Sequence, residues 1–137
     1  MLDLPIMGVN APKEHQRVIA QLTAELYFMF KKGIIPYEPL PEVMVDESQT
    51  SATPDVSLYD NKEGLNKVII EVSGKAGFRK DFSKISEVCG DYNIPEGFVY
   101  NYITGEWRKF KNGTGEITGN PSFCDSIGYD LNDFLSK

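Results

Sequence analysis

The chain has 137 residues, enough for one domain that buries about two thirds of its unfolded surface without disulfide or metal staples. Hydrophobic residues make up 41% and charged residues 25% of it, as in ordinary globular proteins, and no stretch approaches the roughly 18 apolar residues of a membrane span. The net charge of -6 argues against coating of nucleic acid by charge alone, because such binding depends on lysine and arginine that neutralise phosphates. We therefore expect a single domain over residues 1–137, no membrane insertion, and only local contact with any nucleic acid.

The N-terminal residues, MLDLPIMGVNAPKEH, lack the basic start and continuous apolar core of a signal peptide. Cys89 and Cys124 have no metal-ligand spacing, so we expect two reduced thiols in the cytoplasm. His15 is the single histidine of the chain. This excludes a zinc site built from several histidines.

Two stretches have the three- and four-residue apolar spacing of an amphipathic helix. The first runs from residue 12 to residue 32, and Gly33 then ends it. The second covers residues 79–92, where apolar side chains again recur in steps of three and four. We expect both helices to pack one apolar face on a sheet.

The first strands are predicted by the apolar runs between these helices. Residues 33–48 hold three prolines, so they should form an extended edge strand and a short second strand. Residues 54–59 and 67–73 are two apolar runs joined by DNKEGLN, which is a hairpin pattern.

The last strands follow the second helix. Residues 97–113 predict two strands around a turn at Thr104 and Gly105, and residues 126–137 predict a short strand that leads into a helical turn. The order helix, strands, helix, strands is typical of an α+β domain with helices packed on one sheet.

Asp55 and Glu71 are the candidate functional pair. Each lies on the more polar face of its strand, because side chains alternate along a strand. If the hairpin folds symmetrically about Glu63, the two carboxylates face each other with Cβ atoms about 4.5–5.5 Å apart. Two carboxylates and a backbone carbonyl such as that of Val72 suit Mg²⁺. Such an ion activates water and neutralises charge as a phosphodiester is attacked.

The same spacing also permits a structural explanation. Asp55 then caps a turn after Pro54, and Glu71 lies on a solvated face or pairs with a lysine. A different hairpin register would separate the two carboxylates and leave a structural protein without a metal site.

Pro54 and Asp55, the apolar strand after them and Glu71 at the start of EVS resemble the motif of the PD-(D/E)xK nuclease superfamily. More narrowly, the order of EHQRVIAQL, PDVSLY, VIIEVS, RKDFSK and an aromatic strand is similar to the Uma-type branch of candidate restriction endonucleases. The resemblance runs over residues 14–110.

The resemblance implies a restriction-endonuclease-like α+β core with a central mixed sheet flanked by helices. It also implies that Asp55 and Glu71 hold Mg²⁺ or Mn²⁺, and that the substrate is DNA, whose phosphodiester bonds are hydrolysed. Glu14 is implied as a further metal ligand; alternatively, it is a first-turn acid favoured by the helix dipole. Small nucleases of this kind often pair to cut two strands, so the analogy allows a homodimer.

The chain departs from the family at the catalytic lysine. The usual position, two residues after Glu71, holds Ser73, which cannot supply a positive charge. Lys75 has the same strand parity as Glu71. Lys84 lies on the following helix, where the Uma-type branch similarly carries an aspartate and a lysine, here Asp81 and Lys84. We favour Lys84 over Lys75 as the lysine that assists the attacking water.

Four residues are candidate contacts to the substrate: His15, Ser73, Arg79 and Lys80. Arg79 and Lys80 belong to the densest basic patch of this acidic chain, and beside paired acids such a patch can grip phosphates. The structural alternatives are a solvated helix face for the patch and a surface imidazole for His15.

Two functions remain open on the sequence. The first is a metal-dependent endonuclease that hydrolyses DNA, with Asp55, Glu71 and Lys84 or Lys75 as catalytic residues. The alternative is a catalytically inactive nuclease-fold protein that acts as a protein- or nucleic-acid-binding module. Ser73 in the lysine position and the acidic net charge favour this alternative.

Overall fold

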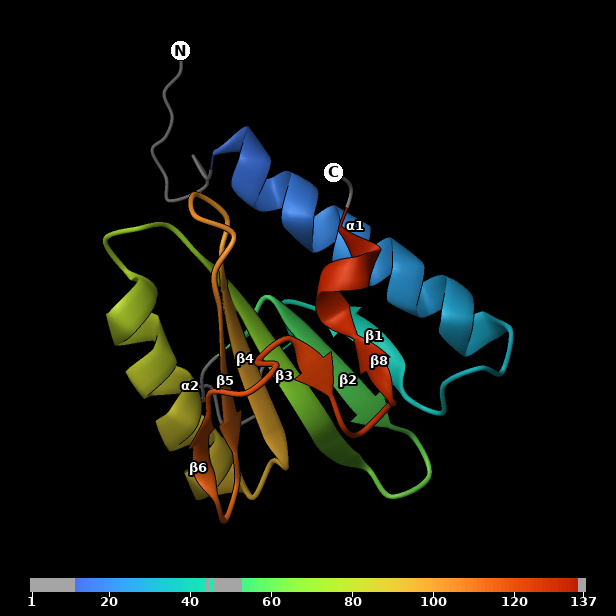
Figure 1. Ribbon diagram of the computed structural model, residues 1–137. Coiled ribbons are helices and arrows are strands. Elements are labelled where there is room, and N and C mark those ends of the chain that lie inside the picture. Colours follow the sequence, from blue (N-terminus) through green and yellow to red (C-terminus); the bar gives the residue numbers. More distant parts are fainter. Residues whose placement is uncertain (1–11, 44, 46–52, 136–137) are drawn as a thin grey trace.

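The protein is represented by a computed structural model that describes residues 12–43, 45 and 53–135 (Figure 1). The elements in chain order are α1 (Lys13–Lys31), β1 (Glu38–Pro41), β2 (Val56–Asp60), β3 (Leu65–Ser73), α2 (Phe78–Tyr92), β4 (Glu96–Asn101), β5 (Trp107–Lys111), β6 (Gly115–Ile117), β7 (Phe123–Cys124), β8 (Tyr129–Asp130) and the 3-10 helix η2 (Leu131–Phe134). No helix in the described part is long and apolar enough to cross a membrane.

Six strands form one mixed sheet in the order β1-β2-β3-β4-β5-β6. Neighbouring strands are antiparallel except for β3 and β4, which are parallel and are connected through α2. The helices α1 and α2 lie on opposite sides of the sheet, and β7, β8 and η2 lie on the side of α1 (Figure 1). Helices on both sides explain why the central strand β3 is an almost continuous apolar run.

The alternation of side chains along β3 divides the core into two parts. Val68, Ile70 and Val72 are buried in the part that α1 covers. Ile69 is buried in the part that α2 covers, together with Phe82 and other side chains of that helix. The next residue on this second face is the polar Glu71. Its carboxylate therefore lies between the sheet and α2.

Gly97 on β4 allows α2 to approach the sheet closely. A Cβ atom at this position would lie 2.5 Å from Cγ2 of Ile85 and 2.6 Å from Sγ of Cys89, both on α2. Any side chain larger than hydrogen would force the helix away. This close packing holds the middle of α2 against the sheet, where Gly97 is paired with Ile69 of β3.

The register of the hairpin β2–β3 agrees with the predicted one near the carboxylates. Val56 lies across from Ile70 and Leu58 across from Val68, which continues to Asp55 across from Glu71. Between Leu58 and Tyr59 the register shifts by one residue, so that Tyr59 pairs with Asn66. Symmetry about Glu63 therefore holds at the inner end of the hairpin and fails next to its loop.

Most predicted elements are confirmed. Both predicted helices lie within one residue of α1 and α2, and the hairpin, the proline-rich edge strand β1 and the late strands are present. Gly105 lies in the predicted turn with a positive φ of 78°, and β8 leads into η2 as expected. The short strands β6 and β7 were not predicted. The second strand expected within 33–48 lies largely outside the described residues, because residues 44 and 46–48 are not described.

A buried ion pair holds the C-terminal segment on the sheet. Glu96 on β4 and Lys109 on β5 are 1% and 3% exposed, and their charged atoms lie 3.0 Å apart. The Glu96 carboxylate also accepts hydrogen bonds from the backbone N–H groups of Asp125 and Ser126 and from the Ser126 hydroxyl. These bonds lower the pKa of Glu96 even though burial acts in the opposite direction. Cys89 and Cys124 are free, buried thiols, as expected.

Candidate functional site

Asp55 and Glu71 lie where β2 begins and β3 approaches its end. The N–H of Val72 donates to Oδ2 of Asp55 over 2.7 Å, and the N–H of Asp55 donates to the Glu71 carboxylate. Each carboxylate thus accepts a hydrogen bond from the backbone of the other strand. This reciprocal arrangement holds the two acidic side chains together at the end of the β2–β3 ladder.

The pKa values of both carboxyl groups are raised. Burial is the largest cause for Glu71, followed by the charges of Asp55 and Asp81, and together they raise its pKa from an ordinary 4.5 to about 8. Burial also raises the pKa of Asp55, while the Val72 N–H and His15 act in the opposite direction. The pair therefore resists carrying two negative charges, which is the condition that a bound cation relieves.

His15 approaches the pair from the first turn of α1. Its Nε2–H donates to the carbonyl of Val72 over 2.9 Å, and Nε2 lies 3.8 Å from Oδ2 of Asp55. Its ring also packs edge-on against Tyr102. The N–H and C=O of Val72 point beyond the start of β2, and the side chains of Asp55 and His15 satisfy them. His15 therefore lies at the carboxylate pair, and is not a free surface imidazole.

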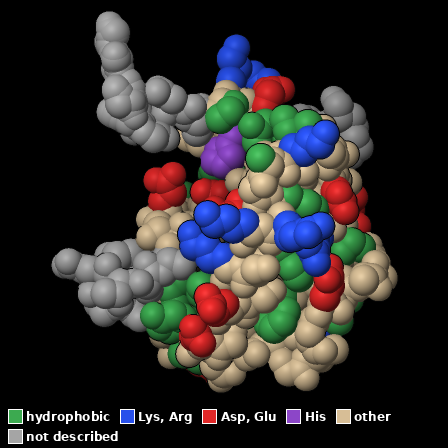
Figure 2. Space-filling view, turned by 90° about the vertical axis from the view of Figure 1, so that its left-hand side faces the viewer, with side chains coloured by type: hydrophobic (Ala, Val, Ile, Leu, Met, Phe, Trp, Pro, Cys, Tyr) green, Lys and Arg blue, Asp and Glu red, His purple; other side chains and the backbone are tan. Residues whose placement is uncertain are grey.

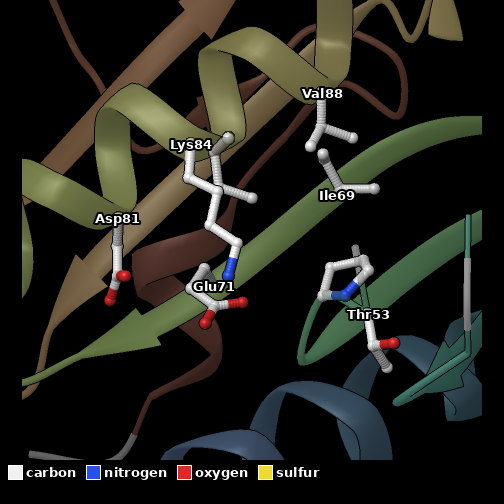
Figure 3. Close-up of a pocket in the computed structure, with 8 residues that line it drawn as sticks. Thr53, Ile69, Glu71, Asp81, Lys84 and Val88 are labelled. Carbon is white, nitrogen blue, oxygen red and sulfur yellow. The ribbon is translucent and has the colours of Figure 1, made fainter. Parts of the chain in front are cut away.

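The helix α2 supplies the opposite wall of the site. A small pocket with a cavity volume of about 10 Å³ is lined by Thr53, Pro54, Ile69, Glu71, Asp81, Lys84, Ile85 and Val88. Figure 3 shows the Lys84 ammonium group pointing from α2 toward the Glu71 carboxylate. The charge of Lys84 lowers the pKa of Glu71, against the larger effects of burial and of the two aspartates. Lys84 is thus the lysine that reaches Glu71.

Ser73 has a structural role in this arrangement. It is 2% exposed, and its hydroxyl donates to Oδ2 of Asp81 in the first turn of α2. The bond ties the end of β3 to the helix that carries Lys84. The sequence pointed to Asp81 only through its pairing with Lys84. The sequence did allow a contact between Asp81 and Ser73 to be predicted, because Ser73 lies on the same strand face as Glu71.

The remaining predicted residues lie around the pair. Glu14 is exposed and pairs with Arg17, and both line a separate depression. Lys75 and Arg79 line another depression, which is described below, and Lys80 is exposed on α2. The structure thus gathers Asp55, Glu71, His15, Ser73 and Lys84 at one place, with the other candidates beside it.

The site offers a metal ion two carboxylates and the carbonyl of Val72. Among residues 12–43, 45 and 53–135, no three His, Cys, Asp or Glu side chains are grouped closely enough to hold one. The pair of carboxylates fits Mg²⁺ in a different way, since this ion commonly binds through one or two carboxylates and completes its shell with waters and substrate phosphate. The Val72 carbonyl lies at the same point, although it already accepts from His15.

Comparison with known proteins adds a similar fold. No family model matches the sequence, and no curated protein matches it. The structure is similar to a crystal structure from Anabaena variabilis ATCC 29413 that is described as a candidate nuclease belonging to DUF820. The identity is 12% and the TM-score 0.67, over 90% of this chain and 81% of the other. A nuclease from a fusselovirus has a TM-score of 0.42 and 15% identity, over 81% of this chain and 71% of that one.

The similarity to the DUF820 structure concerns the fold. The six-stranded mixed sheet with helices on its two sides confirms the predicted α+β class with a central mixed sheet, and the DUF820 structure has a similar fold. The Uma-type branch stays a prediction. The site residues also remain candidates, because the match does not assign them a role.

Proposed function

We propose that the chain is a metal-dependent nuclease that hydrolyses phosphodiester bonds of DNA. The observation that carries the proposal is the pair of partly buried carboxylates, Asp55 and Glu71, whose pKa values are both raised. Glu71 also lines one small pocket together with Lys84. Groups with perturbed pKa values that gather in a pocket are candidates for catalysis. The nuclease-like fold supports the same class of reaction.

Asp55 and Glu71 are the residues that would hold Mg²⁺ or Mn²⁺. When bound, such an ion would activate a water molecule and stabilise the charge that develops on the phosphate. The two side chains would provide only part of the coordination shell, and the phosphate of the substrate would provide another part. Glu14 has no part in this proposal, since its carboxylate pairs with Arg17.

Lys84 takes the role that the family gives to the lysine of the strand. Its ammonium group points to Glu71 and would stabilise negative charge on the attacking water and on the phosphate. Ser73 acts through Asp81, which it binds at the start of α2. His15 acts as a positioning residue, since it binds the Val72 carbonyl beside Asp55.

A catalytically inactive binding module is not favoured. That alternative started from the absence of a lysine at position 73. This argument for an inactive protein is weakened, because another cationic side chain, that of Lys84, lines the same pocket as Glu71.

The first test is calorimetric titration of the metal-stripped protein with Mn²⁺ and Mg²⁺. We expect binding by the wild type and loss of binding in Glu71→Ala and Asp55→Ala. Glu25→Ala, which removes an exposed carboxylate from α1, is the matched control and should bind as the wild type does. Equal binding by all four proteins would refute the assignment of the pair as the metal site.

The second test is cleavage of DNA in the presence of the same ions. Lys84→Ala should slow cleavage without abolishing metal binding, whereas Lys75→Ala should retain the cleavage step when DNA is saturating. Wild-type protein that binds metal but leaves single- and double-stranded DNA intact would contradict the proposed reaction.

A further inference from the structure

A second depression lies beside the carboxylate pair, on the other side of the connection from β3 to α2. Its polar lining comes from Lys75, Arg79, Asn101, Thr104, Glu106 and Arg108, and its volume is about 580 Å³. They come from the loop after β3, the end of β4, the first turn of α2, the turn between β4 and β5, and the start of β5. Figure 2 shows the face that carries α2, where Lys and Arg side chains gather beside acidic ones. We call this hollow the basic depression.

The charge of the basic depression is unusual for this chain, whose net charge is -6. Within the described residues, neither Lys75 nor Arg79 has a carboxylate within ion-pair distance. Arg108 does have one, because its guanidinium binds both oxygens of Glu116, at 2.8 and 2.7 Å, and lies over the Phe82 ring. Glu106 is the single acidic side chain of the lining. Two cations therefore remain available to an anion.

Asn101 gives the depression an oriented hydrogen-bond donor. The residue is 2% exposed, and its Oδ1 accepts from the N–H groups of Ile103 and Thr104 over 2.9 and 3.2 Å. These two bonds fix which end of the amide is the oxygen. The NH₂ group has no acceptor among the described residues. Asn101 can therefore offer a ligand in the depression only a donor, at little cost in side-chain entropy.

The first turn of α2 adds further donors. Gly77 caps the helix without any side-chain hydrogen bond, so no capping side chain satisfies the first N–H groups. Asp81 lies in the same turn and binds Ser73 toward the carboxylate pair. The N-terminus of a helix favours anions, and here it coincides with Lys75, Arg79 and the Asn101 amide.

We infer that the basic depression binds a backbone phosphate of the nucleic acid, next to the phosphate that is cleaved. The inference rests on the proposed function, and assigns to Lys75 and Arg79 the charge and to Asn101 the oriented donor. The depression is wide and open, which suits an extended backbone. Contacts of this type position the substrate and do not read its sequence.

The test is DNA binding measured in the Glu71→Gln background, so that hydrolysis does not consume the probe. The probe is a fluorescein-labelled duplex, and its anisotropy is followed at several salt concentrations. Arg79→Ala and Lys75→Ala should each lower the slope of log affinity against log salt by about 1, equally for unrelated sequences. Lys62→Ala, in the hairpin loop at the opposite end of β2 and β3, is the matched control and should leave the slope unchanged.

Asn101→Asp separates a ligand contact from a structural role. The aspartate keeps the size of the side chain and both accepted hydrogen bonds, but replaces the NH₂ donor with a charged oxygen. We expect the variant to remain folded, with a melting temperature lowered by the buried charge, and DNA binding to be lost. Normal DNA binding by this variant would overturn the assignment. Displacement of DNA by micromolar inorganic phosphate at constant ionic strength would also overturn it, because the site would then be one for free phosphate.

The outcomes distinguish this inference from the proposed reaction. Unchanged slopes in both Arg79→Ala and Lys75→Ala, or absence of DNA binding, would overturn the inference, whether or not the wild type cleaves DNA. The expected slopes without any cleavage by the wild type would retain the phosphate site and contradict only the hydrolysis.

Discussion

Replacing Glu71 with glutamine should stabilise the metal-free protein at high pH. The carboxyl group is partly buried beside Asp55 and Asp81, and its pKa is raised to about 8. Glutamine has the same size and can still accept the hydrogen bond from the Asp55 N–H through its amide oxygen. The substitution therefore removes the ionisation while it preserves most of the packing.

The direction of the effect follows from the two pKa values. Below pH 4.5 the Glu71 carboxyl is protonated in both the folded and the unfolded chain, and its ionisation does not affect stability. Between pH 4.5 and about 8 the unfolded chain releases the proton and the folded chain retains it, so the free energy of unfolding falls as the pH rises. At about 1.4 kcal/mol per pKa unit, the loss amounts to roughly 3–5 kcal/mol. Glu71→Gln should escape this loss.

The assay is urea denaturation in EDTA at intervals between pH 4 and pH 9. Near pH 4 the midpoints of wild type and Glu71→Gln should coincide, and near pH 9 the variant should be more stable by roughly 3–5 kcal/mol. Glu25→Gln removes an exposed carboxylate from α1 and should follow the wild type at every pH. Parallel pH profiles for wild type and Glu71→Gln would show that the carboxyl group is not strained, and would remove the main argument for a cation site.

Three further substitutions test the framework around the site. Gly97→Ala should lower the free energy of unfolding by about 1–3 kcal/mol, since the new methyl group collides with α2, and an unchanged urea midpoint would contradict the close packing. Lys109→Met should lower the free energy of unfolding by about 3–5 kcal/mol at pH 7, because Glu96 is then left ionised and buried. The cost should shrink as the pH falls through 4.5, where Glu96 becomes protonated, and equal losses of stability at pH 7 and pH 4 would contradict the ion pair. His15→Ala should lower the free energy of unfolding by about 1–3 kcal/mol, because the Val72 carbonyl loses its donor. Unchanged thermal and urea denaturation would contradict this role of His15.

The sequence contained enough information for the local elements. The apolar spacing in α1 and α2 is long and regular, and tertiary packing reinforces it, so both helices were predicted within one residue. The short strands β6 and β7 have three and two residues, too few for alternation to become visible. The pairing of Asp55 with Glu71 was predictable because the hydrophobic residues of both strands must face the same side of the sheet.

Long-range contacts were beyond such reasoning. The hydrogen bond from His15 to the Val72 carbonyl joins residues 57 positions apart, and depends on where α1 crosses the sheet. The ion pair between Glu96 and Lys109 likewise requires knowledge that β4 and β5 are neighbours and that the C-terminal segment covers them. The choice between Lys75 and Lys84 was of the same kind, because it depends on the position of α2 over β3.

The irregularity between Leu58 and Tyr59 separates the two ends of the hairpin β2–β3. On the side of the shift toward Asp55 and Glu71, buried residues under α1 hold the register, whereas on the side toward the loop the exposed loop residues set it. Changes in loop length at residues 61–64 can therefore be absorbed locally, without rotating Asp55 away from Glu71. The loop is thus a suitable place for an inserted peptide tag or a fluorescent label that leaves the carboxylate geometry intact.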